Sequence, residues 1–216
     1  MLHLPMSSVG DSRLDRGALT AAQSRAEFDR TLQDALAAVP AVRGVNNHMG
    51  SELTQLTPQM DWLMQGLLQR QLYFVDSRTT ALTVAAERAA ASGVPHLSRQ
   101  VFLDNEPTSM AIDREFQLLL GRAVQEGLAV GIGHPYPETI AYLRRALPAA
   151  RCRGIRLALV SEVLPGARVT RPPESLAGSG RFSPGQASET HLDAPLRHVG
   201  LGFGYGVFTE VEDTGG

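Results

Sequence analysis

Three histidines lie at or just beyond the ends of short apolar runs, where a side chain can reach a site. His3 lies in the first run, His48 follows residues 42–45 and His134 follows residues 129–133. Neutral imidazoles at such positions suit zinc or a similar divalent ion, which in catalytic sites usually has three protein ligands and an open position. Each histidine alone could instead be a hydrogen-bonded structural residue. Three at equivalent positions favour a metal site with all three as ligands.

A carboxylate and a guanidinium follow a further apolar run, residues 73–75. Asp76 could orient a metal-bound imidazole or accept a proton, and Arg78 could hold an anionic group or a developing negative charge. These two residues are therefore candidate catalytic groups. The alternative is a purely structural ion pair.

Polar side chains beside these runs are candidate substrate-binding residues. Asn47 and Ser51 lie on either side of His48. The two glycines of this stretch, Gly44 and Gly50, allow a sharp turn or a close approach to a ligand. Asp104 and Asn105 follow the apolar run 101–103 and could hydrogen-bond sugar hydroxyls. They could equally cap the helix that follows.

The apolar runs alternate with segments of helical periodicity, which predicts a parallel α/β fold. In such folds the carboxyl ends of the strands lie on one face, so residues distant in sequence converge there. Helices are expected over residues 26–39, 58–69, 80–91, 109–126 and 137–147, the last ending near Pro148, and a final strand is expected over 154–160.

Composition limits the classes of function. The 216 residues are 43% hydrophobic, enough for one domain with a core, here assigned to residues 1–163. Residues 164–216 are rich in Pro and Gly and are predicted to be a poorly ordered tail. The formal net charge of -2 and the absence of an arginine cluster argue against nucleic-acid binding.

Several familiar enzyme motifs are missing from the sequence. The chain has no lysine and therefore no phosphate-binding loop of the G-x-x-x-x-G-K type, and it has no G-x-S-x-G elbow. Gly131 and Gly133 lack the third glycine of a dinucleotide fingerprint. No stretch is apolar and long enough to span a membrane, and no signal peptide is present. Because the sequence opens in the middle of an apparent strand, we expect a preceding segment to be missing.

Four ordered blocks, residues 44–51, 74–79, 101–105 and 131–139, resemble the signature blocks of the divergent polysaccharide deacetylase family. The resemblance covers about residues 1–163. It implies a distorted, irregular (β/α) barrel of the NodB-like type and a divalent metal, usually zinc. It also implies a metal-activated water that removes N-acetyl or related acyl groups from an envelope carbohydrate, and a periplasmic or exported location.

The resemblance also assigns residues. His48 and His134 match the family's metal-ligand candidates, His3 lies in a block where relatives also have a histidine, and Asp76 and Arg78 match a polar pair near the metal. The family's first strand, which ends in paired aspartates, has no counterpart here. Without that base, the chain is expected to bind metal weakly and to turn over poorly.

Two further classes remain open from the sequence. A noncatalytic saccharide-binding or envelope-binding protein could retain the barrel and its polar mouth without the chemistry. A metal-dependent aldolase or other barrel lyase is weakened by the absence of a lysine that could form a Schiff base.

Overall fold

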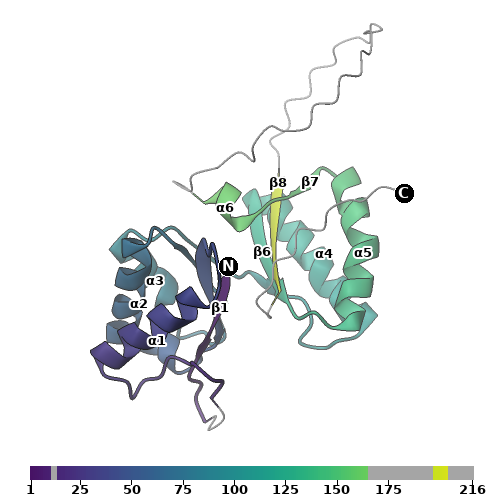
Figure 1. The fold of residues 1–216 in the computed structure, drawn as a ribbon. Coiled ribbons are helices and arrows are strands. Elements are labelled where there is room, and N and C mark those ends of the chain that lie inside the picture. The colour runs from purple at the N-terminus through teal and green to yellow at the C-terminus, as the bar shows by residue number, and fades with distance from the viewer. Residues whose placement is uncertain (11–13, 165–196, 204–216) are drawn as a thin grey trace, which may run out of the picture.

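The computed structural model describes residues 1–10, 14–164 and 197–203, and its strands form two four-stranded parallel sheets (Figure 1). The first sheet has the order β1-β2-β3-β4, with β1 Leu2–Met6, β2 Gly44–Met49, β3 Tyr73–Asp76 and β4 His96–Ser98. The second has the order β5-β6-β8-β7, with β5 Val101–Phe102, β6 Leu128–Gly133, β7 Ile155–Leu157 and β8 Arg197–Phe203. The predicted parallel α/β fold is confirmed.

Helices lie on the outer sides of the two sheets (Figure 1). The first sheet carries α1 Arg25–Ala37, the 3-10 turn η1 Leu53–Gln55, α2 Thr57–Gln69 and α3 Ala85–Ser92. The second carries α4 Ser109–Glu126 and α5 Pro137–Cys152, and the short α6 Val160–Val163 follows β7. None of the helices in the described ranges is long and apolar enough to cross a membrane.

Alternation along the strands decides which side chains face the helices. In β1, Leu2, Leu4 and Met6 are buried in a core that includes residues of α1 and α2. Successive strand residues point to opposite faces, so His3 lies on the face away from that core. His3 pairs with Asn46 of β2, and His48 lies two residues further along the same strand. The parallel register therefore brings the two histidines to one face.

The two sheets adjoin where β4 leads into β5. The Arg99 amide donates to the Asp76 carbonyl of the first sheet, and the next amide, of Gln100, donates to the Val130 carbonyl of the second. A small apolar cluster that includes Val75 and Val130 packs between the sheets. The two residues between β4 and β5 thus join the carboxyl end of β3 to β6.

The expected helices over 58–69 and 109–126 are found within one residue, and the other boundaries differ for identifiable reasons. α3 begins at Ala85 rather than at residue 80, because the Thr83 hydroxyl hydrogen-bonds to Asp76 and to the backbone N–H of Ala85 before the helix starts. α5 continues through Pro148 to Cys152, and Ala150 in its last turn is buried in the second core. Packing there outweighs the hydrogen bond lost at the proline.

The structure differs from two predictions for the last part of the chain, the strand over 154–160 and the tail after residue 163. The expected strand 154–160 is only three residues long, and Val160 opens α6 instead. Residues 197–203 of the predicted tail form β8, which pairs in parallel with both β6 and β7. The rest of that tail, residues 165–196 and 204–216, lies outside the described residues.

Candidate functional site

His3 and His48 are in direct contact. His3 Nε2 and His48 Nδ1 are 3.0 Å apart, and the ring centroids are separated by 4.7 Å. On its other side, His48 Nε2 lies 3.1 Å from the carboxylate of Asp15. Asp15 belongs to the loop between β1 and α1, so this loop joins the site at the histidine pair.

The contacts assign the tautomers of the pair. A carboxylate accepts, so His48 Nε2–H donates to Asp15; in the neutral form of the ring, His48 Nδ1 then accepts from His3 Nε2–H. This leaves His3 Nδ1 as an acceptor, and it is a buried nitrogen without a hydrogen-bond partner in the described part of the chain. A buried lone pair of this kind is available to a ligand that brings positive charge or a donor.

Burial lowers the pKa of His3 from 6.5 to about 4. The nearby Asn46 side chain opposes this shift, whereas the charges of His48 and His134 add to it. His3 is therefore neutral at neutral pH, the form in which imidazole binds metals. The contribution of His134 also shows that the third histidine lies within electrostatic range of His3.

His134 is held by Asp104 at two points. Its backbone N–H donates to Asp104 Oδ2 at 2.6 Å, and its ring Nδ1 lies 3.1 Å from Oδ1. The Thr139 hydroxyl also donates to Oδ2, at 2.8 Å. Because Nδ1–H donates to the carboxylate, Nε2 of the neutral ring carries the free lone pair. The Asp104 side chain is fully buried, whereas that of His134 is 28% exposed, so His134 can reach a bound molecule.

The backbone of β6 is shaped to receive this carboxylate. A Cβ atom at Gly133 would lie 3.1 Å from Asp104 Oδ2, closer than ordinary side-chain contacts. The glycine therefore permits the approach that fixes His134. Thr139 reaches the same oxygen from the first turn of α5, which starts three residues after His134.

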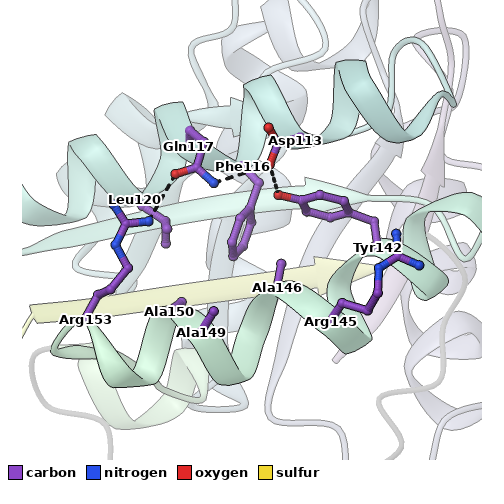
Figure 2. Close-up of a pocket in the computed structure, with 10 residues that line it drawn as sticks. All are labelled: Asp113, Phe116, Gln117, Leu120, Tyr142, Arg145, Ala146, Ala149, Ala150 and Arg153. Atoms are coloured by element: carbon purple, nitrogen blue, oxygen red, sulfur yellow. Dashed lines mark hydrogen bonds between the residues drawn. The ribbon is translucent and has the colours of Figure 1, made fainter.

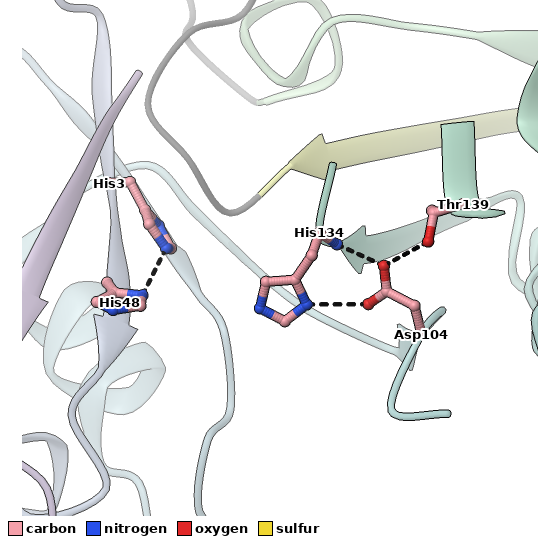
Figure 3. Close-up of polar contacts among 5 residues, drawn as sticks. All are labelled: His3, His48, Asp104, His134 and Thr139. Atoms are coloured by element: carbon pink, nitrogen blue, oxygen red, sulfur yellow. Dashed lines mark hydrogen bonds and ion pairs between the residues drawn. The ribbon is translucent and has the colours of Figure 1, made fainter. Parts of the chain in front are cut away.

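Figure 3 shows the ring of His134 directed toward the His3–His48 pair, with Asp104 and Thr139 on its far side. The first sheet contributes the pair and the second contributes the dyad of Asp104 and His134. The structure thus brings the three predicted histidines together in two groups. His48 and His134 lie at the carboxyl ends of β2 and β6, whereas His3 is the second residue of β1 and not at its carboxyl end as predicted. Among the described residues, no group of three or more His, Cys, Asp or Glu side chains is arranged to hold a metal ion.

Asp76 and Arg78 organise the loop after β3. Asp76 is fully buried, and its oxygens accept from the Arg78 backbone N–H at 2.8 Å and from the Thr83 hydroxyl at 3.1 Å. Burial raises the pKa of Asp76, and these hydrogen bonds partly offset the increase. Arg78 has an exposed side chain and a positive φ of 48°. Arg99 donates to the carbonyls of Ser77 and Arg78, and these two hydrogen bonds hold the loop in its strained conformation.

Asn47 and Ser51 also make internal contacts. The Asn47 amide donates to the Met49 carbonyl and accepts from the Ser77 N–H, tying the loops after β2 and β3 together. Ser51 Oγ accepts from the Val9 N–H at 3.1 Å. Both residues shape the backbone around His48.

Asn105 is exposed, whereas Asp104 binds His134. Neither residue caps α4. Thr108 does so by accepting from the Ala111 N–H, so the capping alternative for Asp104 and Asn105 is wrong.

A groove between α4 and α5 is separate from these residues (Figure 2). Across it, the Tyr142 hydroxyl donates to Asp113, and Arg153 donates to Gln117. Burial and the Asp113 carboxylate both raise the pKa of Tyr142. These contacts tie the two helices together and so help to hold the start of α5, which carries Thr139.

The family model described as divergent polysaccharide deacetylase matches residues 1–164, which contain every residue of the site described above. The chain belongs to this family. The match ends before β8, so the divergent polysaccharide deacetylase unit and the described sheet differ in extent by one strand.

Two similar proteins share the family region. An uncharacterized protein of Haemophilus influenzae is 36% identical over 147 residues, which cover 68% of this chain and 52% of that protein. The uncharacterized protein YibQ of Escherichia coli is 35% identical over 145 residues, which cover 67% of this chain and 46% of that protein. This divergent polysaccharide deacetylase chain therefore spans about half the length of these curated relatives.

A solved structure supports the fold. The crystal structure of the uncharacterized protein ATU2773 from Agrobacterium tumefaciens C58 superimposes with a TM-score of 0.68 at 24% sequence identity. The superposition covers 70% of this chain and 62% of that one. At this identity the likeness shows the mixed α/β fold alone.

Sequence reasoning missed Asp15 and Thr139. For Asp15, the only indication in the sequence was its position in a Gly- and Ser-containing loop after the first strand. Thr139 stands at the start of α5, where a hydroxyl is commonly read as a cap, yet it binds a carboxylate from another strand.

Proposed function

We propose that the chain is a metal-dependent hydrolase that removes acyl groups from an envelope carbohydrate. The family supports a carbohydrate-acting hydrolase. The proposal rests on two neighbouring groups of side chains. One is His134, which Asp104 orients, and the other is the pair of His3 and His48. Amide hydrolysis needs both a proton-transfer group and a means of activating water and carbonyl.

His134 serves as the acid–base group in this proposal. Asp104 fixes its orientation and tautomer and stabilises the imidazolium that forms when Nε2 takes a proton from the water that attacks the acyl carbon. The same nitrogen then returns the proton to the leaving amine. Thr139 and the His134 backbone N–H keep the carboxylate in place through this exchange.

His3 and His48 would hold the metal, for which zinc is our proposal. His3 fits this role, because it is neutral well below pH 7 and its buried Nδ1 has no partner among the described residues. Both ring nitrogens of His48 contact Asp15 and His3, so His48 would bind the ion only by giving up one of these contacts. A divalent ion there would supply Lewis-acid activation of water and of the acyl carbonyl. The histidine pair alone falls short of the three ligands usual for catalytic zinc, so a further ligand would be needed.

The remaining candidates have supporting roles. Asp76 positions the backbone of Arg78, whose exposed guanidinium would hold an anionic or developing negative charge. Asn47 and Ser51 shape the His48 loop, and exposed Asn105 would contact sugar hydroxyls. We further propose that the two sheets belong to a distorted (β/α) barrel of the NodB-like type, and that the protein acts in the periplasm or outside the cell.

Metal content and acetate release from an N-acetylated glycan, measured on four forms, test the proposal. The parent chain should bind zinc, and His3→Ala and His48→Ala should lose it. His134→Ala should retain the metal while acetate release falls by about two orders of magnitude or more. Thermal unfolding controls for folding in each variant.

A noncatalytic saccharide-binding protein is the second candidate. It is favoured by the lack of a group of three metal-ligating side chains in the ranges that the structure describes. If the parent chain binds glycan but holds no zinc and releases no acetate, this candidate replaces the hydrolase.

A further inference from the structure

Tyr136 presents an aromatic ring beside His134. Its ring centroid is 5.0 Å from that of His134, with an angle of 31° between the planes. The residue is 39% exposed, and in the described part of the chain its hydroxyl has no hydrogen-bond partner. One side of the ring is thus supported by the histidine, and much of the residue remains open to solvent.

The ring ends a column of neighbouring groups whose ring planes are tilted to one another. The Arg99 guanidinium lies 5.2 Å from the Phe102 ring centroid, and Phe102 lies 5.4 Å from the His134 ring. Tyr136 follows on the histidine. Such a column fixes the position of its last member, because each group restricts the movement of the next.

The backbone restricts Tyr136 as well. Pro135 and Pro137 flank it, and its φ of −66° and ψ of 145° place it directly before the first turn of α5. A proline at the start of a helix fixes its own φ and limits the conformation of the residue before it. The backbone around Tyr136 therefore has little conformational freedom left to lose when a ligand stacks on the ring.

We propose that Tyr136 is the stacking platform for the pyranose ring of an acylated amino sugar. The inference rests on the proposed function and adds to it a residue that would bind the sugar ring. A pyranose has an apolar face of C–H groups that packs on an aromatic ring, while its hydroxyl and acylamino groups project around the edge. A sugar on the open side of Tyr136 would lie beside the end of β6 that carries His134, and so at the candidate site.

Calorimetric titration with a β-1,4-linked N-acetylglucosamine tetramer tests the platform. Tyr136→Ala should weaken binding at least about tenfold, whereas Tyr136→Phe, which keeps the ring, should stay within about threefold of the parent chain. Met110→Ala, which truncates an 82% exposed apolar side chain on α4, is the matched control and should bind like the parent. Asp104→Asn should still bind the tetramer while losing acetate release.

The outcomes separate the two proposals. If the parent binds and Tyr136→Ala binds equally well, the platform is wrong and the proposed function stands. If Tyr136→Phe loses as much affinity as Tyr136→Ala at an unchanged Tm, the hydroxyl rather than the ring is responsible, and the stacking proposal is overturned. If the parent neither binds nor deacetylates the tetramer, both proposals fail.

Discussion

The carboxylate of Asp104 binds His134 through the ring and the backbone at once, at 3.1 Å and 2.6 Å. One buried side chain from the loop after β5 thereby fixes both the position and the tautomer of a histidine at the end of β6. Two-point attachment is what an acid–base group requires, because a small rotation would move Nε2 away from a bound amide.

Asp104→Asn should reduce acetate release by a factor of about 10² to 10³, because an amide cannot stabilise the imidazolium as a carboxylate does. Thr139→Val removes only one hydrogen bond to the same carboxylate and should reduce the rate by less. Equal losses in the two variants would contradict the acid–base role.

Gly133→Ala should disturb the same dyad through packing. The added methyl group would press on Asp104 Oδ2, so we expect a loss of about 1 kcal/mol in unfolding free energy together with a reduced rate. Gly121→Ala is the matched control, because nothing lies within 4 Å of a Cβ there and the site is inside α4. That substitution should stabilise the chain by up to about 1 kcal/mol without affecting the rate.

The stability of the metal-free chain should fall between pH 6.5 and pH 4 because of His3. Its folded pKa of about 4 is below the ordinary value of 6.5, so in this interval the unfolded chain binds a proton that the folded chain does not. The loss is at most about 3 kcal/mol, and it is absent above pH 7. Asp76 acts in the opposite direction, since its raised pKa favours the folded state as pH falls.

Comparing the parent with His3→Gln by urea unfolding at several pH values isolates the histidine contribution. The difference in unfolding free energy between the two chains should change with pH only in this interval. A constant difference would show that folding does not lower the pKa of His3.

Arg78→Gly tests whether Arg78 matters for its backbone conformation or for its guanidinium group. Arg78 has a positive φ of 48°, which glycine adopts without the Cβ penalty, so unfolding free energy should change by less than about 1 kcal/mol in either direction. If the guanidinium contacts the substrate, KM or kcat should worsen at least about tenfold. An unchanged kcat/KM would leave Arg78 with a purely structural role.

The sequence was sufficient for features that repeat with a period. Short apolar runs indicated several of the strands, and helical spacing located α2 and α4 within one residue. The three histidines were found because His3 lies in such a run and His48 and His134 follow one. Their division into a pair and a dyad depends on the contacts of Asp15 and Asp104, which join segments distant in the chain and leave no local pattern.

The boundaries that were wrong reflect tertiary contacts that override local preference. Pro148 does not end α5, because Ala150 beyond it is buried. Thr83 delays the start of α3 through its bond to Asp76. The glycine-rich stretch that contains β8 has the composition of a loop, and only its two neighbouring strands give it a regular structure.

The position of β8 has a consequence for how the protein is made. Residues 197–203 leave the ribosome after β6 and β7, yet they lie between those two strands in the finished sheet. Until they emerge, β7 has no partner among the strands described, and one edge of β6 is open to other chains. Nascent chains halted before residue 197 should therefore aggregate or recruit chaperones more readily than chains released after residue 203.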